Sequence, residues 1–170
     1  MPAKTTKADR FSFLNDGPYI FIEGDELVEK RIVNGKVVIK KLPKDAYKTK
    51  FKQEKSKFKK VKKIAALSDI HGQHDLAVEI LTNHQIIDAE ENWIYGEGHL
   101  IIVGDIFDRG EKVNETLWLL YKLEGQAKEA GGKVHVLLGN HEYLVFSKDL
   151  RYIHRNYIIT SGLMLSLIHI

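Results

Sequence analysis

Three short segments of this sequence carry side chains that bind hard metal ions. They read Asp69-Ile70-His71-Gly72, Gly104-Asp105-Ile106-Phe107-Asp108-Arg109-Gly110 and Gly139-Asn140-His141-Glu142. Carboxylate, imidazole and amide groups suit divalent manganese, iron or zinc. The chain has no cysteine, so thiolate ligands are excluded. Two such ions about 3.5–4 Å apart can clamp a phosphate group and activate a water molecule for in-line attack.

Each of these segments follows an apolar run, and the pattern between the runs predicts helices. The runs cover 64–67, 100–103 and 134–138, and helical periodicity covers 73–84 and 112–129. Strands that alternate with helices in this way indicate parallel βαβ units. In such a sheet the carboxyl ends of the strands meet at one edge, where ligands bind. The sequence therefore predicts that the three segments converge.

Taken in order, the three segments resemble the N-terminal signature motifs of calcineurin-like metallophosphoesterases of the phosphoprotein-phosphatase type. The Asp108-Arg109-Gly110 ending and the Asn140-His141-Glu142 tripeptide carry this resemblance. The Ser68-Asp69 start and the stretch 93–100 are most similar to bacterial members grouped as Shewanella-like phosphatases. The resemblance covers roughly residues 64–145 and implies an α/β fold. This chain would supply the N-terminal βαβαβ part of a two-sheet α-β-β-α sandwich.

The resemblance also implies a role for each residue of the motifs. Asp69 and His71 would bind the first of two divalent metal ions (Mn, Fe or Zn). Asp105 would bridge both ions, and Asn140 would bind the second. His141 would donate a proton to the leaving group, oriented by Asp108. Arg109 would hold the phosphate oxygens with its planar fork of donors.

The resemblance further implies that two histidines far downstream complete the second metal site. Only His154 and His169 follow the third motif here, and neither fits as a ligand. We therefore expect a C-terminally truncated chain whose second metal site is incomplete and whose activity is weak. His74, His84, His99 and His135 fit no motif, and we expect ordinary structural roles for them.

The expected function is metal-dependent hydrolysis of phosphate monoesters, with a phosphorylated protein (on Ser/Thr or Tyr) or a small phosphoester as the substrate. Hydrolysis of dinucleoside polyphosphates is an alternative, because enzymes of that class share the scaffold. A second alternative is a non-catalytic binding module with a vestigial site. Hydrolysis of p-nitrophenyl phosphate that requires metal would separate the enzymes from the binding module.

The residues before the first motif divide into two parts. Residues 1–43 contain β-rich runs with turns at Gly24-Asp25 and Asn34-Gly35, which predict a small β-meander. Residues 44–63 carry ten lysines and one apolar helical face, which predict a solvated linker or helix. A surface for an anionic partner is the alternative for this lysine-rich segment. The third predicted domain is the incomplete metallophosphoesterase domain, 64–170.

Composition adds limits on location. The net charge is +3 over 170 residues, and 44% of the residues are hydrophobic, as in an ordinary soluble protein. No apolar run approaches the ~20 residues that span a bilayer, so we expect no membrane partner. The first ten residues are polar and no apolar stretch follows, so no signal peptide is expected. The cytoplasm is the default expectation for the compartment.

Overall fold

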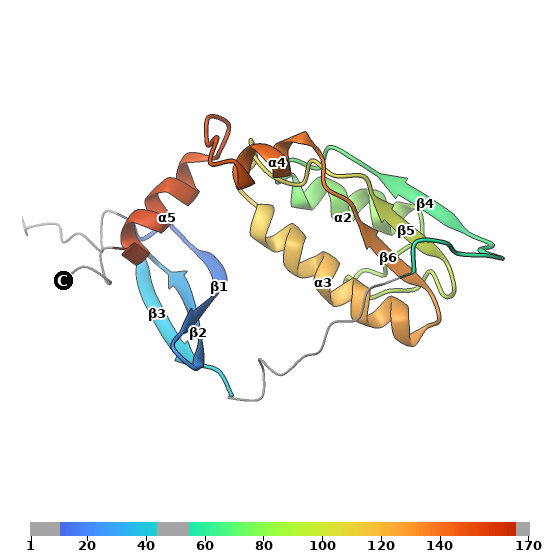
Figure 1. The fold of residues 1–170 in the computed structure, drawn as a ribbon, viewed down its shortest axis with the longest axis horizontal. Coiled ribbons are helices and arrows are strands. Elements are labelled where there is room, and N and C mark those ends of the chain that lie inside the picture. The colour runs from blue at the N-terminus through green and yellow to red at the C-terminus, as the bar shows by residue number, and fades with distance from the viewer. Residues whose placement is uncertain (1–10, 44–54, 166–170) are drawn as a thin grey trace, which may run out of the picture. The chain divides into compact units, whose positions relative to one another are not determined.

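The computed structural model describes residues 11–43 and 55–165 (Figure 1). The chain divides into two compact units. One unit contains residues 55–154 and all three motifs, and the other contains the described residues before the lysine-rich segment together with 155–165.

The unit with the motifs is built on a three-stranded parallel sheet in the order β4-β5-β6. Its elements are β4 (Ile64–Leu67), α2 (His74–Asn83), β5 (His99–Ile102), α3 (Val113–Glu129) and β6 (Lys133–Val136), as labelled in Figure 1. This arrangement confirms the predicted βαβαβ order and the α/β fold class. Each strand and helix lies within one or two residues of its predicted position.

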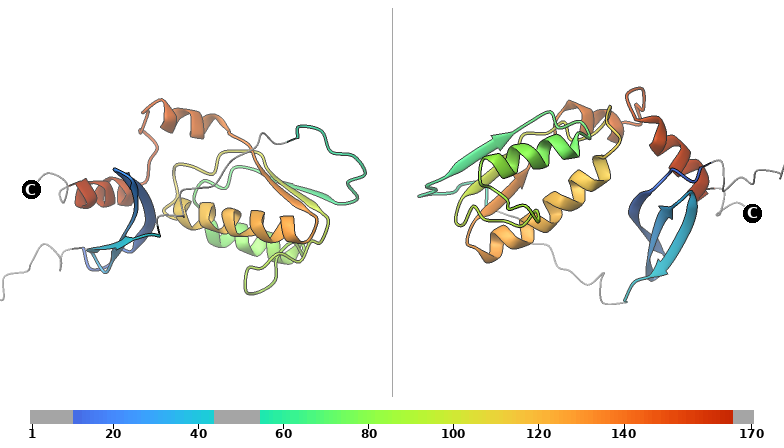
Figure 2. Two further views of the ribbon diagram at one scale, coloured as in Figure 1. Left: turned by 60° about the horizontal axis from the view of Figure 1, so that its bottom comes forward. Right: turned by 180° about the vertical axis from the view of Figure 1, so that it is seen from behind.

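Both helices cover the same face of this sheet (Figure 2). Leu100 pairs in register with Val134, and both side chains are buried. In α3, Leu120, Leu123 and Ala127 supply the buried face. These apolar contacts fix the strands and thereby fix the loops that leave their carboxyl ends.

The other unit contains an antiparallel meander of β1 (Asp16–Glu23), β2 (Glu26–Val33) and β3 (Lys36–Lys41). Asn34 and Gly35 both have positive φ, of 50° and 73°, as a two-residue hairpin turn of this kind requires. The meander agrees with the prediction from the turn residues.

Helix α5 (Arg155–Leu165) belongs to the same unit as the meander. Met164 packs in one core with Leu14 and Ile32. The Thr160 hydroxyl donates a hydrogen bond of 2.7 Å to Asp16 Oδ2. The sequence predicts 64–170 as one domain, whereas these contacts group α5 with the N-terminal sheet. The domain boundaries at 43 and 63 remain predictions.

The lysine-rich segment is described only from residue 55. No helix is present between 55 and 63, so the helical alternative is wrong for this part. Phe58 instead packs edge-on against His99 and His135, with ring centroids 5.2 and 5.0 Å apart. Residues 44–54 lie outside the described residues. Within the described ranges, no helix is long and apolar enough to cross a membrane.

Candidate active site

Backbone hydrogen bonds join the loop after β4 to the loop after β5. The amide of His71 donates to the carbonyl of Asp105 at 2.9 Å, and the amide of Gly72 donates to that of Ile106 at 3.0 Å. The first and second motifs therefore run side by side at the carboxyl edge of the sheet, as the βαβ order requires.

The backbone of these two loops adopts an uncommon conformation. Asp69, His71, Asp105, Asp108 and Arg109 all have positive φ, between 47° and 69°. Residues other than glycine enter this left-handed region rarely and at a cost, and such residues concentrate at functional sites. Five such residues lie in the first two motifs. This concentration indicates that the placement of their side chains, and not the intrinsic preference of the backbone, determines the conformation of these loops.

Gly104 permits the close approach of the second and third motifs. Its φ is 90°, and a Cβ atom at this position would collide with the backbone of Gly139. Only glycine combines this conformation with such a contact. The third motif is thereby brought against the loop that carries Asp105.

His71 is buried, and its tautomer is set by a backbone contact. Its Nδ1 lies 2.8 Å from the carbonyl oxygen of Phe107, so Nδ1 carries the proton and donates. Nε2 then keeps its lone pair and lies 3.8 Å from Oδ1 of Asp69. This is the arrangement of a histidine that ligates metal through Nε2 while a second hydrogen bond orients the ring.

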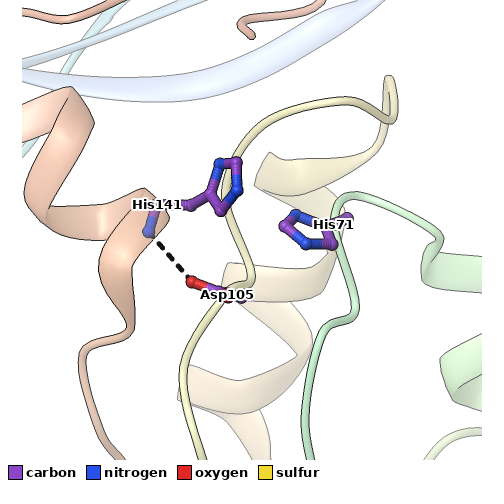
Figure 3. A group of neighbouring side chains, drawn as sticks. All are labelled: His71, Asp105 and His141. Carbon is purple, nitrogen blue, oxygen red and sulfur yellow. Dashed lines mark hydrogen bonds between the residues drawn. The ribbon is translucent and has the colours of Figure 1, made fainter.

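His71, Asp105 and His141 form a group whose ligand atoms lie within 4.8 Å of one another (Figure 3). His71 comes from the loop after β4, Asp105 from the loop after β5, and His141 from α4 (Asn140–Phe146). The amide of His141 donates to Oδ1 of Asp105 at 2.9 Å. The chemistry of the donors fits a hard divalent cation, with one carboxylate and two imidazoles available.

His141 and Asp108 make a buried polar contact within the site. His141 Nδ1 lies 2.8 Å from Asp108 Oδ2, and the two side chains are 6% and 1% exposed. The Asp108 carboxylate accepts a hydrogen bond from Nδ1–H of His141, so the other ring nitrogen, Nε2, is the one left for other partners. Nε2 lies 3.5 Å from Nη2 of Arg109. A histidine oriented by a buried carboxylate beside a guanidinium is suited to general acid–base work.

Glu142 links the third motif to the second, a role that the sequence did not reveal. Its carboxylate accepts four backbone amides, those of Gly139, Asp105 and Ile106 at 2.7 Å and that of Phe107 at 3.0 Å. Burial acts to raise the pKa of Glu142, but the four hydrogen bonds outweigh it and lower that pKa. The position of Glu142, three residues after the helix N-cap Gly139, is typical of a capping box, and this pattern could have predicted its bond to the Gly139 amide.

Tyr152 is a second residue that sequence reasoning missed. Its carbonyl oxygen accepts the amide of Arg109 at 2.9 Å. Its ring lies edge-on to His141, with the centroids 5.5 Å apart. Nothing in the local pattern of 147–154 predicts this contact, because the residues involved are far apart in the chain.

The remaining predicted residues lie at the rim of the site. Asn140 is the exposed first residue of α4, next to His141. Arg109 is exposed, and the Asp69 side chain is 67% exposed. Among the described residues, His74, His84, His99, His135 and His154 do not join the three-residue group. His169 lies outside the described residues.

The fold and this site define the chain as a calcineurin-like phosphoesterase. Residues 62–165 match the model of the calcineurin-like phosphoesterase family, and the chain belongs to this family. The resemblance drawn from the three motifs is therefore confirmed.

Curated relatives match slightly more than half of the chain. Shewanella-like protein phosphatase 2 of Arabidopsis thaliana is 34% identical over 98 residues, which are 58% of this chain and 25% of the relative. Shewanella-like protein phosphatase 1 of Plasmodium berghei is 34% identical over 92 residues, with 54% and 25% covered. The matched part thus spans about a quarter of the length of these relatives.

A solved structure agrees over more of the chain. The cold-active protein-tyrosine phosphatase of a psychrophile, Shewanella sp., is 37% identical with a TM-score of 0.76. The match covers 89% of this chain and 50% of that one. A mutant of a cold-active protein tyrosine phosphatase gives a TM-score of 0.75 at 38% identity. These likenesses support the fold described above.

Proposed function

We propose that this protein is a metal-dependent phosphomonoesterase of the protein-phosphatase type. The observation that carries the proposal is the buried Asp108–His141 pair, whose histidine also groups with His71 and Asp105. An oriented acid next to hard metal ligands is what phosphoester hydrolysis requires, because both the leaving oxygen and the phosphate charge must be stabilised.

The ligand roles follow from the chemistry of the donors and the family motifs. Asp69 and His71 would hold the first ion through a carboxylate oxygen and Nε2. Asp105 would be shared with a second ion, for which Asn140 supplies an amide oxygen. Manganese, iron and zinc all suit this oxygen and nitrogen set. Such ions, when bound, supply a Lewis acid for the phosphate oxygens and a water molecule of lowered pKa.

The side chains of this chain would perform the other steps. The Arg109 guanidinium, exposed at the rim, would bind two phosphate oxygens with its fork of donors. As the bond from phosphorus to the leaving oxygen breaks, protonated His141 would give its Nε2 proton to that oxygen. The Asp108 carboxylate would accept the hydrogen bond from Nδ1–H and thereby orient the ring and stabilise its cationic form before the transfer.

The substrate we propose is a phosphorylated protein. This rests on the names of the relatives, which are protein phosphatases and a protein-tyrosine phosphatase. The same names do not favour a dinucleoside polyphosphate hydrolase or a non-catalytic module. The lysine-rich segment 44–63 as a surface for an anionic partner stays a prediction, and none of the comparisons supports it.

A substrate comparison tests this proposal. With manganese present, release of phosphate from p-nitrophenyl phosphate is measured first. Rates on phosphoserine, phosphothreonine and phosphotyrosine peptides are then compared with the rate on a dinucleoside polyphosphate. Because the second metal site is expected to be incomplete, we expect slow but metal-dependent turnover of the aryl phosphate and of at least one phosphopeptide. Hydrolysis of the dinucleotide alone, or no hydrolysis with manganese bound, would refute the proposed function.

A further inference from the structure

We propose that Glu142 is a positioning residue that holds the Asp105 loop in its metal-binding conformation without touching metal or substrate itself. The inference rests on the proposed function only in taking Asp105 as a metal ligand.

The four amides that Glu142 accepts come from two different loops. Oε1 accepts the amides of Ile106 and Phe107, and Oε2 accepts those of Asp105 and Gly139. An ionised carboxylate offers about four acceptor sites and no donor, so the side chain matches these four donors. The residue is 2% exposed, so water does not compete for these bonds.

Asp105 both donates a hydrogen bond to α4 and accepts one from it. The amide of Asp105 donates to Glu142 at 2.7 Å, while its Oδ1 accepts the amide of His141 at 2.9 Å. Asp105 meanwhile has a φ of 55°, a conformation that costs free energy in any residue but glycine. The Glu142 carboxylate supplies contacts that hold this conformation, in which a ligand oxygen of Asp105 lies within 4.8 Å of the ligand nitrogens of His71 and His141.

No substitution reproduces this arrangement of acceptors. In Glu142→Gln, one oxygen becomes an NH₂ group that faces two backbone amides as a third donor. In Glu142→Asp, the charge remains but the side chain is shorter by one methylene group. The effect on the loop should therefore be large for glutamine and intermediate for aspartate.

Two other roles for Glu142 make different predictions. A direct metal ligand would need a free carboxylate oxygen, whereas each oxygen already accepts two amides. A helix cap alone would account for Gly139, and its loss would lower the stability of α4 without acting on Asp105. Metal affinity and local amide exchange distinguish these roles from positioning.

The experiment compares the wild-type chain with Glu142→Gln, Glu142→Asp and a control, Glu79→Gln, an exposed glutamate of α2. Manganese affinity is measured by calorimetry at a temperature where circular dichroism shows each variant folded. Amide hydrogen exchange is followed without metal. We expect Glu142→Gln to weaken manganese binding by about 10- to 100-fold, the usual effect of losing a residue that orients a metal ligand.

Exchange should become faster at Asp105, Ile106 and Phe107, while the amides of β5 stay protected and the control stays at wild type. Wild-type manganese affinity in Glu142→Gln would overturn the inference, as would a loss of protection across the whole sheet. If the glutamine variant does not fold, Glu142→Asp decides: weakened binding supports the inference and unchanged binding refutes it. Because the readout is manganese binding, failure of phosphate release in the wild-type chain counts only against the proposed function.

Discussion

Asp108 Oδ2 lies 2.8 Å from His141 Nδ1, and both side chains are almost fully shielded from solvent. The contact fixes which ring nitrogen of His141 remains available for chemistry. Asp108 lies in the second motif and His141 in the third, so the pair forms only if the loops after β5 and β6 meet. The contact between the proposed acid and its orienting partner therefore depends on the pairing of β5 and β6 in the parallel sheet.

His141→Ala is predicted to lower kcat by ~10²–10⁴, the range usual for loss of a general acid, while manganese binding is retained. Turnover of a fluorogenic aryl phosphate and calorimetric manganese affinity are measured together, so that slow rates remain detectable. His84→Ala, an exposed histidine at the end of α2, is the control. His141 belongs to the group that could hold an ion, so loss of manganese in the alanine variant would instead make it a ligand.

Gly104→Ala is predicted to destabilise the protein by at least ~1–3 kcal/mol, the cost of a strained backbone at a residue other than glycine. The added Cβ would also meet the Gly139 backbone and separate the second and third motifs. Gly125→Ala is the matched control, because Gly125 lies inside α3 with open space around its Cβ position. There the same change should stabilise by about 0.5–1 kcal/mol. Thermal unfolding measures the stability of both variants. Equal changes in stability for Gly104→Ala and Gly125→Ala would contradict the special role proposed for Gly104.

Calorimetric titration of this chain with manganese is predicted to show one tight site per molecule. Asp69, His71 and Asp105 are proposed to hold one ion, whereas only Asp105 and Asn140 are proposed for the second. One shared carboxylate and one neutral amide are a weak set for a divalent ion. Two tight sites would show that another residue, such as His154, completes the centre.

The position of the site could be predicted from the sequence because three local patterns agree. Each apolar run ends directly before a motif, and the βαβ rule then places Asp69, Asp105 and Asn140 at one edge. The hydrogen bonds of Glu142 could not be predicted, because three of the four donors lie 35 to 37 residues away in the chain. These bonds depend on how the loop after β5 is aligned with the start of α4, and the hydrophobic periodicity of the sequence does not predict that alignment.

Helix α5 shows the same limit at the level of domains. The sequence predicts 64–170 as one incomplete metallophosphoesterase domain, and the family match of 62–165 includes α5. Met164 nevertheless packs with Leu14 and Ile32, and Thr160 bonds to Asp16. Contacts between residues far apart in the chain place α5 with the N-terminal sheet, and no local sequence pattern predicts such contacts.

Asp105 provides the most direct test of the central claim, that phosphate release depends on metal held at the three motifs. Manganese is removed with a chelator and restored in steps, while aryl phosphate hydrolysis and calorimetric binding are followed on the wild-type chain and on Asp105→Asn. We predict no hydrolysis after chelation, recovery that follows manganese occupancy, and loss of both binding and turnover in the variant. Hydrolysis that survives chelation, or wild-type manganese binding by Asp105→Asn, would contradict the account.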